Sequence, residues 1–394
     1  MTAGPETATA IRRPRIKPEH QPYRTTDGHV RIGSVIYGIG AEIEDPNGWI
    51  WTLTEAMDGT RAPEGIITVV RAEHPDVPPE DIRQAMADLR EAGFLEDAGA
   101  TPPPGFGERE QHRYGRGVTL LRWMDLSSRV SAWDTQQRLR QARVLLIGVG
   151  GTGGFAAHAL VASGVGHLHV VEPDIVELSN LNRQPLFRED DIGTPKLDTA
   201  LVTLRALNSD VTVTGEQHRV RDVDDFAALL AAPTAGGRSG ERRGYDLVAL
   251  AADHPPEIRR WANRACLDAD VAWVEAGYHG PLVSVGVHVP GQGPCWRCLR
   301  DGEMARLDLR LAPGQDEEAA SPRMSWNPVN AVTAGLSGSL MAHAAMALLT
   351  GAPPMRPGFR FGINLMALAD PVHARFPRRK ECPDCGRYGQ QDQP

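Results

Sequence analysis

The sequence has 394 residues, of which 41% are hydrophobic and 23% are charged, as expected for a globular protein with about two domains. Its formal net charge of −8 leaves no excess of positive charge to neutralise phosphates, so we expect no nucleic-acid partner. No apolar run approaches the length of a membrane span and residues 1–18 contain no apolar signal segment, so we expect no membrane partner and a cytoplasmic location.

The first hundred residues predict a small domain behind a polar arm. Residues 1–27 are polar and proline-rich, which predicts a flexible arm. Short alternating segments and then three helical segments follow within residues 28–99. The expected strands are 30–32, 35–37 and 41–43, and the expected helices lie at 49–57, around 66–70 and at 80–94. This order predicts an α+β domain that is winged-helix-like.

A proline-rich segment, residues 100–111, predicts a linker to a larger domain over residues 112–388. Apolar strand candidates alternate with helical segments in this second domain. The strand candidates are Arg143–Ile147, His167–Val171, Asp246–Ala251 and Val271–Glu275. The alternation predicts an α/β fold with a Rossmann-like, doubly wound and mostly parallel sheet, covered by helices on both faces.

A glycine-rich loop follows the first of these strands and opens a helix. It reads Gly148-Val149-Gly150-Gly151-Thr152-Gly153-Gly154, and its glycines let backbone N–H groups approach a phosphate at the helix N-terminus. Glu172 ends the next strand, where an acidic residue normally binds ribose hydroxyls. These residues alone leave open an NAD-dependent dehydrogenase, and also a glycine turn without a ligand.

The residues downstream of Glu172 favour a nucleoside triphosphate over a dinucleotide. They include Asn180, Arg183 and Lys196, and the chain has only two other lysines. Hydride transfer has no need for such residues at this position, whereas cations offset the charge that builds up during nucleotidyl transfer. The sequence therefore favours ATP.

The glycine loop, the run Asn180-Leu181-Asn182-Arg183-Gln184 and the run Gly193-Thr194-Pro195-Lys196 occur in family-like order and spacing. In these motifs the chain resembles the E1-like adenylyltransferases of the ThiF, MoeB and HesA type, over approximately residues 110–388. The family includes sulfur-carrier adenylyltransferases and microcin C-type peptide adenylyltransferases. The resemblance implies transfer of AMP from ATP to the C-terminal carboxylate of a peptide or small protein, in which the carboxylate is the nucleophile.

The resemblance also implies a role for individual residues. Glu172, where the family usually has Asp, would hold the ribose, and Asn180 and Arg183 would contact the phosphates. Lys196 would contact the triphosphate, and Asp253 would hold Mg²⁺, although the family's Thr and Asn beside this aspartate are replaced here. The nucleotide-binding set is completed by Gly148, Gly150, Gly151, Gly153, Asp174 and Gln184.

An arginine-rich segment precedes the nucleotide motifs. Arg113-Tyr114-Gly115-Arg116 resembles the family's Arg-Tyr-x-Arg segment, whose last arginine enters the active site of the partner subunit. The resemblance implies that Arg116 is an arginine finger acting in trans and that the protein is a homodimer. An ordinary linker arginine is the alternative.

The cysteines predict a metal site. Cys295-Trp296-Arg297-Cys298 and Cys382-Pro383-Asp384-Cys385 are two C-x-x-C pairs, the pattern of a structural zinc site with four thiolate ligands, and the family resemblance agrees. Redox chemistry is the alternative. Cys266 lies among alanine and leucine residues, so we expect it to pack in the core rather than form a thioester.

The N-terminal domain distinguishes between substrate classes. Peptide-modifying E1-like enzymes often carry a small winged-helix domain that binds a precursor peptide as an added β-strand. The first expectation is therefore an enzyme of ribosomally made peptide natural-product (RiPP) biosynthesis. The alternatives are activation of a ubiquitin-like sulfur carrier ending in Gly-Gly, and a non-catalytic protein that binds and delivers a peptide. The third helix of this domain is acidic on balance, which disfavours DNA binding.

Overall fold

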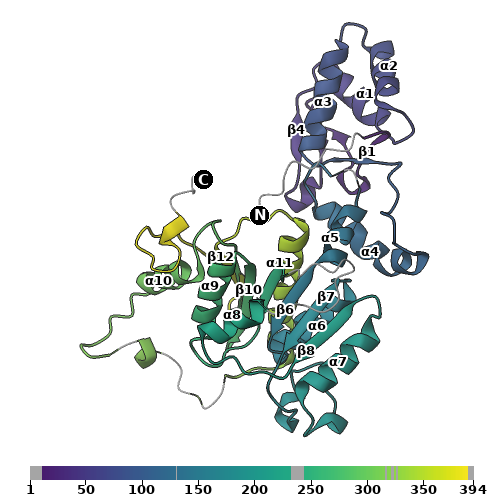
Figure 1. The fold of residues 1–394 in the computed structure, drawn as a ribbon. Helices are drawn as coiled ribbons and strands as arrows, with labels where there is room; N and C mark the ends of the chain where they lie inside the picture. Colours follow the sequence, from purple (N-terminus) through teal and green to yellow (C-terminus); the bar gives the residue numbers. More distant parts are fainter. Residues whose placement is uncertain are drawn as a thin grey trace. The chain divides into compact units, whose positions relative to one another are not determined.

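The chain folds into two compact units, each of which has its own core. Unit 1 contains the N-terminal residues up to Arg138 together with Thr350–Pro354, and unit 2 contains Leu139–Leu349 and the residues from Met355 onward. The computed structural model (Figure 1) describes residues 11–129, 131–231, 244–315, 317–320, 324 and 327–388.

Unit 1 combines short antiparallel strands with helices (Figure 1). β1 (Pro14–Ile16) pairs with β5 (Leu95–Asp97), and β2 (Tyr23–Arg24), β3 (Val30–Ile32) and β4 (Ala41–Ile43) form a second sheet. The helices are α1 (Trp49–Ala56), α2 (Pro63–Glu73), α3 (Pro79–Glu91), α4 (Glu108–Met124) and α5 (Trp133–Gln141), which crosses into unit 2. Leu53, Ile66 and Ile82 of α1–α3 share one apolar core. Strands followed by three short helices confirm the predicted small α+β domain.

Two local expectations for unit 1 were wrong. Residues 14–24, predicted within the flexible arm, form β1, a 3-10 turn η1 (Pro18–His20) and β2, because Ile16 is buried and pairs with Leu95 far along the chain. Residues 1–10 of that arm lie outside the described residues. Residues 35–37 form a 3-10 turn, η2 (Val35–Tyr37), because Gly38 ends it with a φ of 77° and Ile36 is 86% exposed.

Unit 2 is built on an eight-stranded sheet with the order β13-β12-β11-β10-β9-β6-β7-β8. The strands are β6 (Arg143–Ile147), β7 (His167–Val171), β8 (Thr212–Glu216), β9 (Leu247–Leu250), β10 (Ala272–His279), β11 (Leu282–His288), β12 (Phe359–Asn364) and β13 (Val372–Arg375). The neighbours from β10 through β9, β6 and β7 to β8 are parallel, and β10 to β13 are antiparallel. The mostly parallel Rossmann-like sheet is thereby confirmed, with an antiparallel extension that the sequence had not indicated.

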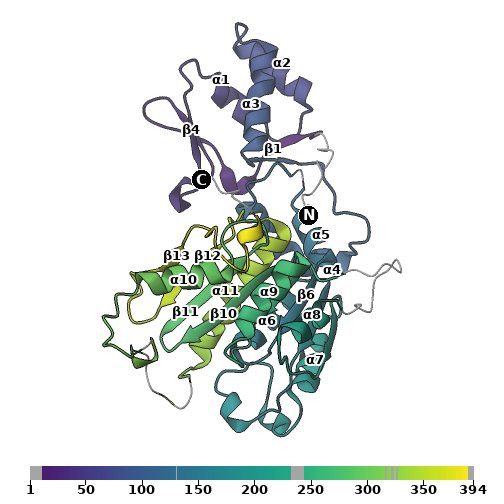
Figure 2. The same ribbon diagram turned by 60° about the vertical axis from the view of Figure 1, so that its left-hand side comes forward.

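Helices cover both faces of this sheet (Figure 2). α6 (Gly151–Ala162), α7 (Lys196–Leu207) and α11 (Ala331–Thr350) pack on one face, and α8 (Val223–Ala231) and α9 (Ile258–Ala269) pack on the other. Val144 and Leu146 of β6 belong to the first core, whereas Leu145 and Ile147 belong to the second. This alternation is the period of a strand that is buried on both faces, and it confirms the doubly wound arrangement.

α11 is longer and more apolar than the sequence analysis allowed for. Its 20 residues have a mean hydropathy of 1.4, so by length and composition it could cross a membrane. Half of this stretch is buried, and Met341, Ala342 and Ala345 pack in the core beside the sheet. The core helix of a globular protein meets the same criteria, so α11 is weak evidence for a membrane span.

Candidate nucleotide site and cysteine cluster

The glycine loop joins β6 to α6 at the carboxyl edge of the sheet. Gly148 has a φ of 89°, and a Cβ atom on it would lie 3.1 Å from the backbone nitrogen of Ala252. A Cβ atom on Gly153 would lie only 1.9 Å from the carbonyl oxygen of Gly148, so no larger residue fits there. The predicted strand–loop–helix context is thus confirmed, and it places the first N–H groups of α6 at the turn, as in phosphate-binding loops.

Glu172 follows β7 and fastens the glycine loop. Its side chain is buried, and Oε2 accepts a hydrogen bond of 2.8 Å from the backbone nitrogen of Val149. The other oxygen, Oε1, accepts one of 3.0 Å from the backbone nitrogen of Asp174. Each oxygen retains a second lone pair, so the predicted contact with a ribose remains compatible with this geometry.

The run from Asn180 to Gln184 lies directly against the glycine loop. A Cβ atom on Gly151 would lie 3.4 Å from the carbonyl oxygen of Arg183, and one on Gly150 would lie 3.7 Å from Nε2 of Gln184. Gln184 is 4% exposed, yet its Oε1 has no hydrogen-bond partner. A buried polar atom without a partner is costly, so a ligand that donates a hydrogen bond beside this loop would stabilise the site.

Asn180 has a structural contact as well as its predicted role. Its Oδ1 accepts a 3.0 Å hydrogen bond from the backbone nitrogen of Glu177 and so caps the 3-10 turn η3 (Leu178–Asn180). The Asn180 side chain therefore shapes the segment that carries Arg183. Direct contact between Asn180 and a phosphate stays a prediction.

Lys196 opens α7, and the structure brings it to Asp174. Lys196 Nζ lies 3.5 Å from Asp174 Oδ2, and Nη2 of Arg219 lies 2.7 Å from Oδ1 of the same carboxylate. Asp174 therefore holds two cations, which identifies it as a residue that orients Lys196. A bound triphosphate would compete with Asp174 for both cations. Arg219 was missed by the sequence analysis because no motif surrounds it.

Asp253 follows β9 at the same sheet edge. β10 pairs Glu275 with Leu250, the last residue of β9, and Tyr278 lies three residues beyond this pair, near enough to Asp253 for the carboxylate to affect it. The Tyr278 hydroxyl is hydrogen-bonded to Arg183. Burial raises the pKa of this hydroxyl, Arg183 lowers it, and Asp253 raises it. Tyr278 was missed because the predicted strand ended too early, at Glu275, whereas β10 continues to His279.

The structure gathers most of the predicted site in unit 2. Arg183 contacts the glycine loop and Tyr278, and Tyr278 lies close to Asp253. Lys196 meets Asp174, whose backbone is held by Glu172. Arg116 is exposed on α4, which belongs to unit 1, so its role in the site stays a prediction.

The four cysteines of the two C-x-x-C pairs come together and are buried. The Sγ atoms of Cys295 and Cys382 are 3.7 Å apart, those of Cys298 and Cys385 are 3.6 Å apart, and all four lie within 4.8 Å of one another. Tetrahedral zinc with Zn–S bonds of about 2.3 Å separates its sulfur ligands by about 3.8 Å. The cluster therefore fits the predicted zinc ion.

Cys266 is separate from this cluster. It lies on α9 and is completely buried among apolar residues, including Phe226 and Trp273. Burial raises the pKa of its thiol, which disfavours the reactive thiolate form. This environment agrees with the expectation that Cys266 packs in the core.

The sequence matches the ThiF family over residues 124–385, well over half of the chain. The chain belongs to the ThiF family. A relative within this group is the SAMP-activating enzyme E1 of Haloferax volcanii, which is 32% identical over 258 residues, covering 65% of this chain and 84% of that protein. Membership of the ThiF family assigns the chain to the adenylyltransferases, the enzyme class that the motifs predicted.

Other known proteins share parts of this ThiF-family chain or its fold. Ubiquitin-like modifier-activating enzyme 5 of Oryza sativa is 34% identical over 191 residues, which are 48% of this chain but only 43% of that enzyme. The solved structure of the microcin C7 biosynthetic enzyme MccB in complex with N-formylated MccA has a TM-score of 0.68 at 21% identity. That likeness covers 95% of this chain and 99% of MccB, and it shows a shared fold.

Proposed function

We propose that this protein adenylates the C-terminal carboxylate of a peptide in the biosynthesis of a ribosomally made peptide natural product. A carboxylate oxygen attacks the α-phosphorus of ATP, the bond to the bridging oxygen breaks, and pyrophosphate leaves with the electron pair. The observation that supports this proposal is that Arg183 contacts the glycine loop and Tyr278, Tyr278 lies near Asp253, and Lys196 pairs with Asp174. Two cations and one carboxylate at a phosphate-binding turn suit a triphosphate with its metal ion.

Each residue of the site contributes positioning or charge. The glycine loop offers N–H groups to the phosphates, and Arg183 and Lys196 offset the charge that develops on the leaving pyrophosphate. Asp253 would hold Mg²⁺, since carboxylate oxygens are the ligands this ion prefers, and the ion would neutralise phosphate charge. Asp174 and Tyr278 orient the two cations. No covalent nucleophile of the protein is required.

One structural Zn²⁺ per chain is the second part of the proposal. The cysteines come from the start of α10 (Trp296–Arg306) and from the C-terminal segment at residues 382–385. Four protein thiolates fill a tetrahedral site and leave no position for a substrate. The zinc would therefore fix the C-terminal segment to α10 without taking part in the reaction.

The N-terminal module, defined here as residues 11–97, favours a peptide as the substrate. β4 is exposed and pairs with β3 on one side, and among the described residues no strand pairs with its other edge. An open edge of this kind can accept a peptide as an added strand. The likeness to MccB, solved in complex with N-formylated MccA, extends over this module, since it covers 95% of the chain.

Activation of a ubiquitin-like sulfur carrier is the second candidate function. It is favoured by relatives named for activating ubiquitin-like modifiers and SAMP, which are 34% and 32% identical to this chain over 191 and 258 residues. A non-catalytic delivery protein would not need the cations at the glycine loop. The homodimer with Arg116 acting in trans and the cytoplasmic location complete the proposal.

A competition experiment separates the two candidate substrates. Peptides encoded beside the gene should support ATP–pyrophosphate exchange, and an N-terminal fragment of the active peptide should inhibit it competitively, because the fragment occupies the module. We expect the fragment to bind the module with micromolar affinity, about −8 kcal/mol, as is plausible for a short peptide added along an edge strand. The same fragment should not inhibit exchange with a carrier protein. If only a carrier protein ending in Gly-Gly supports exchange, the peptide is not the substrate and activation of a sulfur carrier becomes the favoured function.

A further inference from the structure

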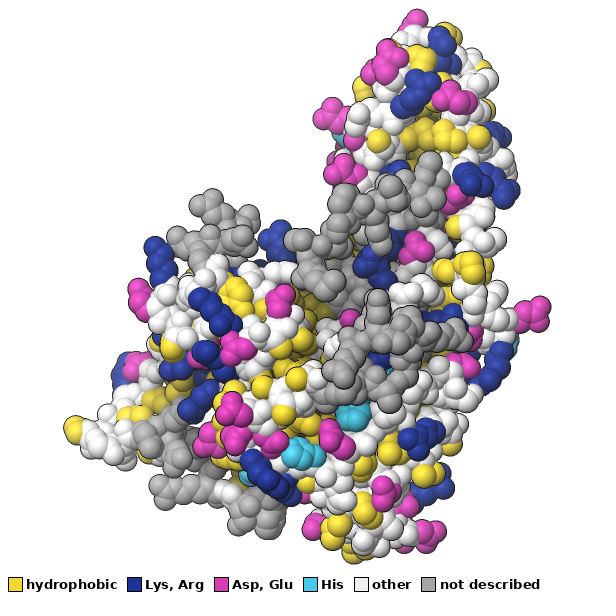
Figure 3. Space-filling model, viewed as in Figure 1, with side chains coloured by type: hydrophobic (Ala, Val, Ile, Leu, Met, Phe, Trp, Pro, Cys, Tyr) yellow, Lys and Arg dark blue, Asp and Glu magenta, His cyan; other side chains and the backbone are white. Residues whose placement is uncertain are grey.

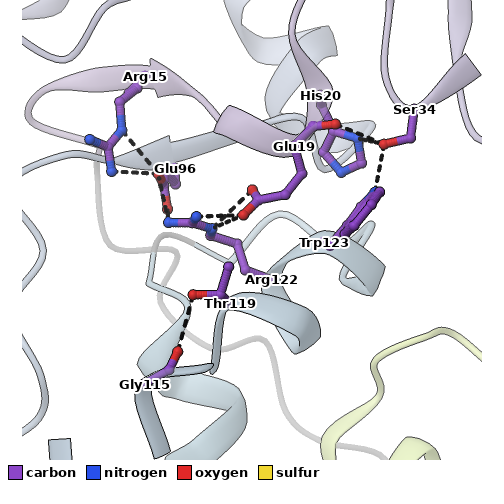
Figure 4. A network of polar contacts seen from close by, with 9 residues as sticks. All are labelled: Arg15, Glu19, His20, Ser34, Glu96, Gly115, Thr119, Arg122 and Trp123. Atoms are coloured by element: carbon purple, nitrogen blue, oxygen red, sulfur yellow. Dashed lines mark hydrogen bonds and ion pairs between the residues drawn. The ribbon is translucent and has the colours of Figure 1, made fainter. Parts of the chain in front are cut away.

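A network of charged residues, most of them half-buried, joins the N-terminal module to α4 within unit 1 (Figure 4). The guanidinium of Arg122, on the last turn of α4, reaches two acids on different module segments. Its Nη2 lies 2.5 Å from Oε1 of Glu19 in η1, and its Nη1 lies 3.4 Å from Oε2 of Glu96 in β5. Glu96 is 5% exposed and also pairs with Arg15 of β1, at 2.6 Å.

Three more contacts hold the end of α4 to the same module. Trp123 donates a hydrogen bond of 2.6 Å from Nε1 to Oγ of Ser34, and its ring packs edge-on against Tyr37 of η2 (Figure 4 shows the first contact). The buried Lys17 donates a 2.5 Å hydrogen bond from Nζ to the carbonyl oxygen of Asp125, just beyond α4. The end of α4 is thus bound to η1, β5 and η2, three separate parts of the module.

The rest of α4 extends from this fixed end. α4 is one continuous helix of 17 residues, about 26 Å long, and Arg116 lies on it at an exposed position. Beyond the helix, Arg129 binds the side chain of Asp125 at 2.8 Å and donates to the carbonyl oxygen of Thr350, the last residue of α11. The segment after α4 therefore has a further contact within unit 1, from Arg129 to Thr350, which does not involve Arg122.

Only an arginine can make the central contact. The planar guanidinium of arginine can bind two carboxylates at once, whereas the ammonium group of a lysine acts as a point charge. The Arg122 side chain is 18% exposed and its partner Glu19 is 10% exposed, so little solvent competes for this contact. The proline-rich segment after residue 100 is consequently not a free hinge between module and α4.

We propose that Arg122 is a positioning residue that couples the module to α4, the helix that carries Arg116, so that binding of a peptide by the module promotes the adenylation reaction. This inference rests on the proposed function, because it requires a peptide on the module. Without Arg122 the peptide would still bind, and the contacts of Arg129 with Asp125 and Thr350 would remain. The advantage that module binding gives to the reaction would be lost, since misplacement of a bound reactant lowers its rate.

The test compares two substrates in the intact protein. One is a precursor peptide that supports ATP–pyrophosphate exchange, and the other is its C-terminal fragment, which is too short to reach the module. With Arg122→Gln, kcat/KM for the full peptide should fall about tenfold to a hundredfold. Exchange with the fragment, and the Kd of the full peptide, should stay within about twofold of wild type.

Matched variants separate positioning from a structural role. Arg15→Gln removes an ion pair to the same Glu96 but leaves α4 untouched, so it should preserve the preference for the full peptide. Ser34→Ala removes the contact with Trp123 without leaving a buried charge unpaired, and it should weaken the preference even if Arg122→Gln does not fold. Equal losses on both substrates, or an unchanged preference in Arg122→Gln and Ser34→Ala, would overturn the inference. If the wild-type protein shows no higher kcat/KM for the full peptide than for the fragment, both the inference about Arg122 and the proposed binding of the peptide by the module would be overturned.

Discussion

Replacing Lys196 by alanine is expected to lower ATP–pyrophosphate exchange by about 10²–10³-fold while the protein stays folded. The ammonium group would stabilise the charge that develops as pyrophosphate leaves, and a preorganised cation acts mainly in the transition state. The Asp174 side chain that pairs with Lys196 is 47% exposed, so this ion pair contributes little to the stability of the fold. Unfolding would therefore not explain the loss of activity. The check is the exchange rate at saturating ATP, with the thermal midpoint measured alongside.

The matched control is Lys380→Ala, which removes an exposed lysine outside the nucleotide site and should leave exchange unchanged. Asp253→Ala should lose activity to a similar extent, because it removes the proposed ligand of Mg²⁺. Full activity of both the Lys196 and Asp253 variants would show that the reaction takes place elsewhere.

Arg116 adds a test of the proposed homodimer to this series. Arg116→Ala should be inactive alone, yet a mixture with Lys196→Ala should regain about a quarter of wild-type activity, because each mixed dimer contains one complete site. No recovery, once subunit exchange has been verified, would rule out an arginine acting in trans.

Cys382→Ser is expected to abolish zinc binding and to destabilise the protein strongly. Binding of zinc by four thiolates is coupled to folding, with apparent free energies of about 10–16 kcal/mol in small zinc peptides. Even a loss of about 3 kcal/mol would lower the thermal midpoint by roughly 6–12 °C in a unit of this size. Elemental analysis and thermal unfolding of the same samples measure both effects.

Cys266→Ala provides the control for this metal prediction. It removes a buried cysteine outside the cluster, so zinc content should stay at one ion per chain, although packing in the core is disturbed. Exchange activity should also persist, since the buried thiol has no proposed role in the reaction. A wild-type protein that is fully stable without zinc would contradict the assignment of the four cysteines.

Local patterns predicted the features that depend on neighbouring residues. The glycine loop was recognisable because a tight strand–loop–helix turn requires glycine, as the short contacts at Gly148 and Gly153 show. The cysteine pairs were recognisable because each C-x-x-C spacing is a ligand motif in itself. The winged-helix-like order of elements followed in the same way from the helical spacing of apolar residues.

The features that were missed depend on contacts between distant segments. The sequence around Ile16 is mostly polar, and β1 forms because it pairs with β5, which follows three helices later in the sequence. β12 is half-buried at every position and β13 alternates between half-buried and exposed residues, so neither strand has a fully buried face. Tyr278 comes to the site because β10 lies beside β9, and Arg219 because it pairs with Asp174, 45 residues earlier in the sequence. No local motif encodes either contact.

Surface charge gave a useful but limited guide. On the face shown in Figure 3, acidic and basic side chains are intermixed. Arg264 and Arg387, for example, both pair with Asp268. Such pairs offset charge locally, so a net charge of −8 describes the whole chain and says little about any one patch.

The most direct measurement of the central claim is ATP–pyrophosphate exchange with one peptide in two forms, a free C-terminal carboxylate and a C-terminal amide. The carboxylate is the proposed nucleophile, so the free-acid peptide should support exchange and should appear in mass spectra as an AMP conjugate. The amide should support neither, although it should still bind the module. Equal exchange with both forms, or no exchange with any peptide or carrier together with tighter binding of NADH than of ATP, would contradict the account.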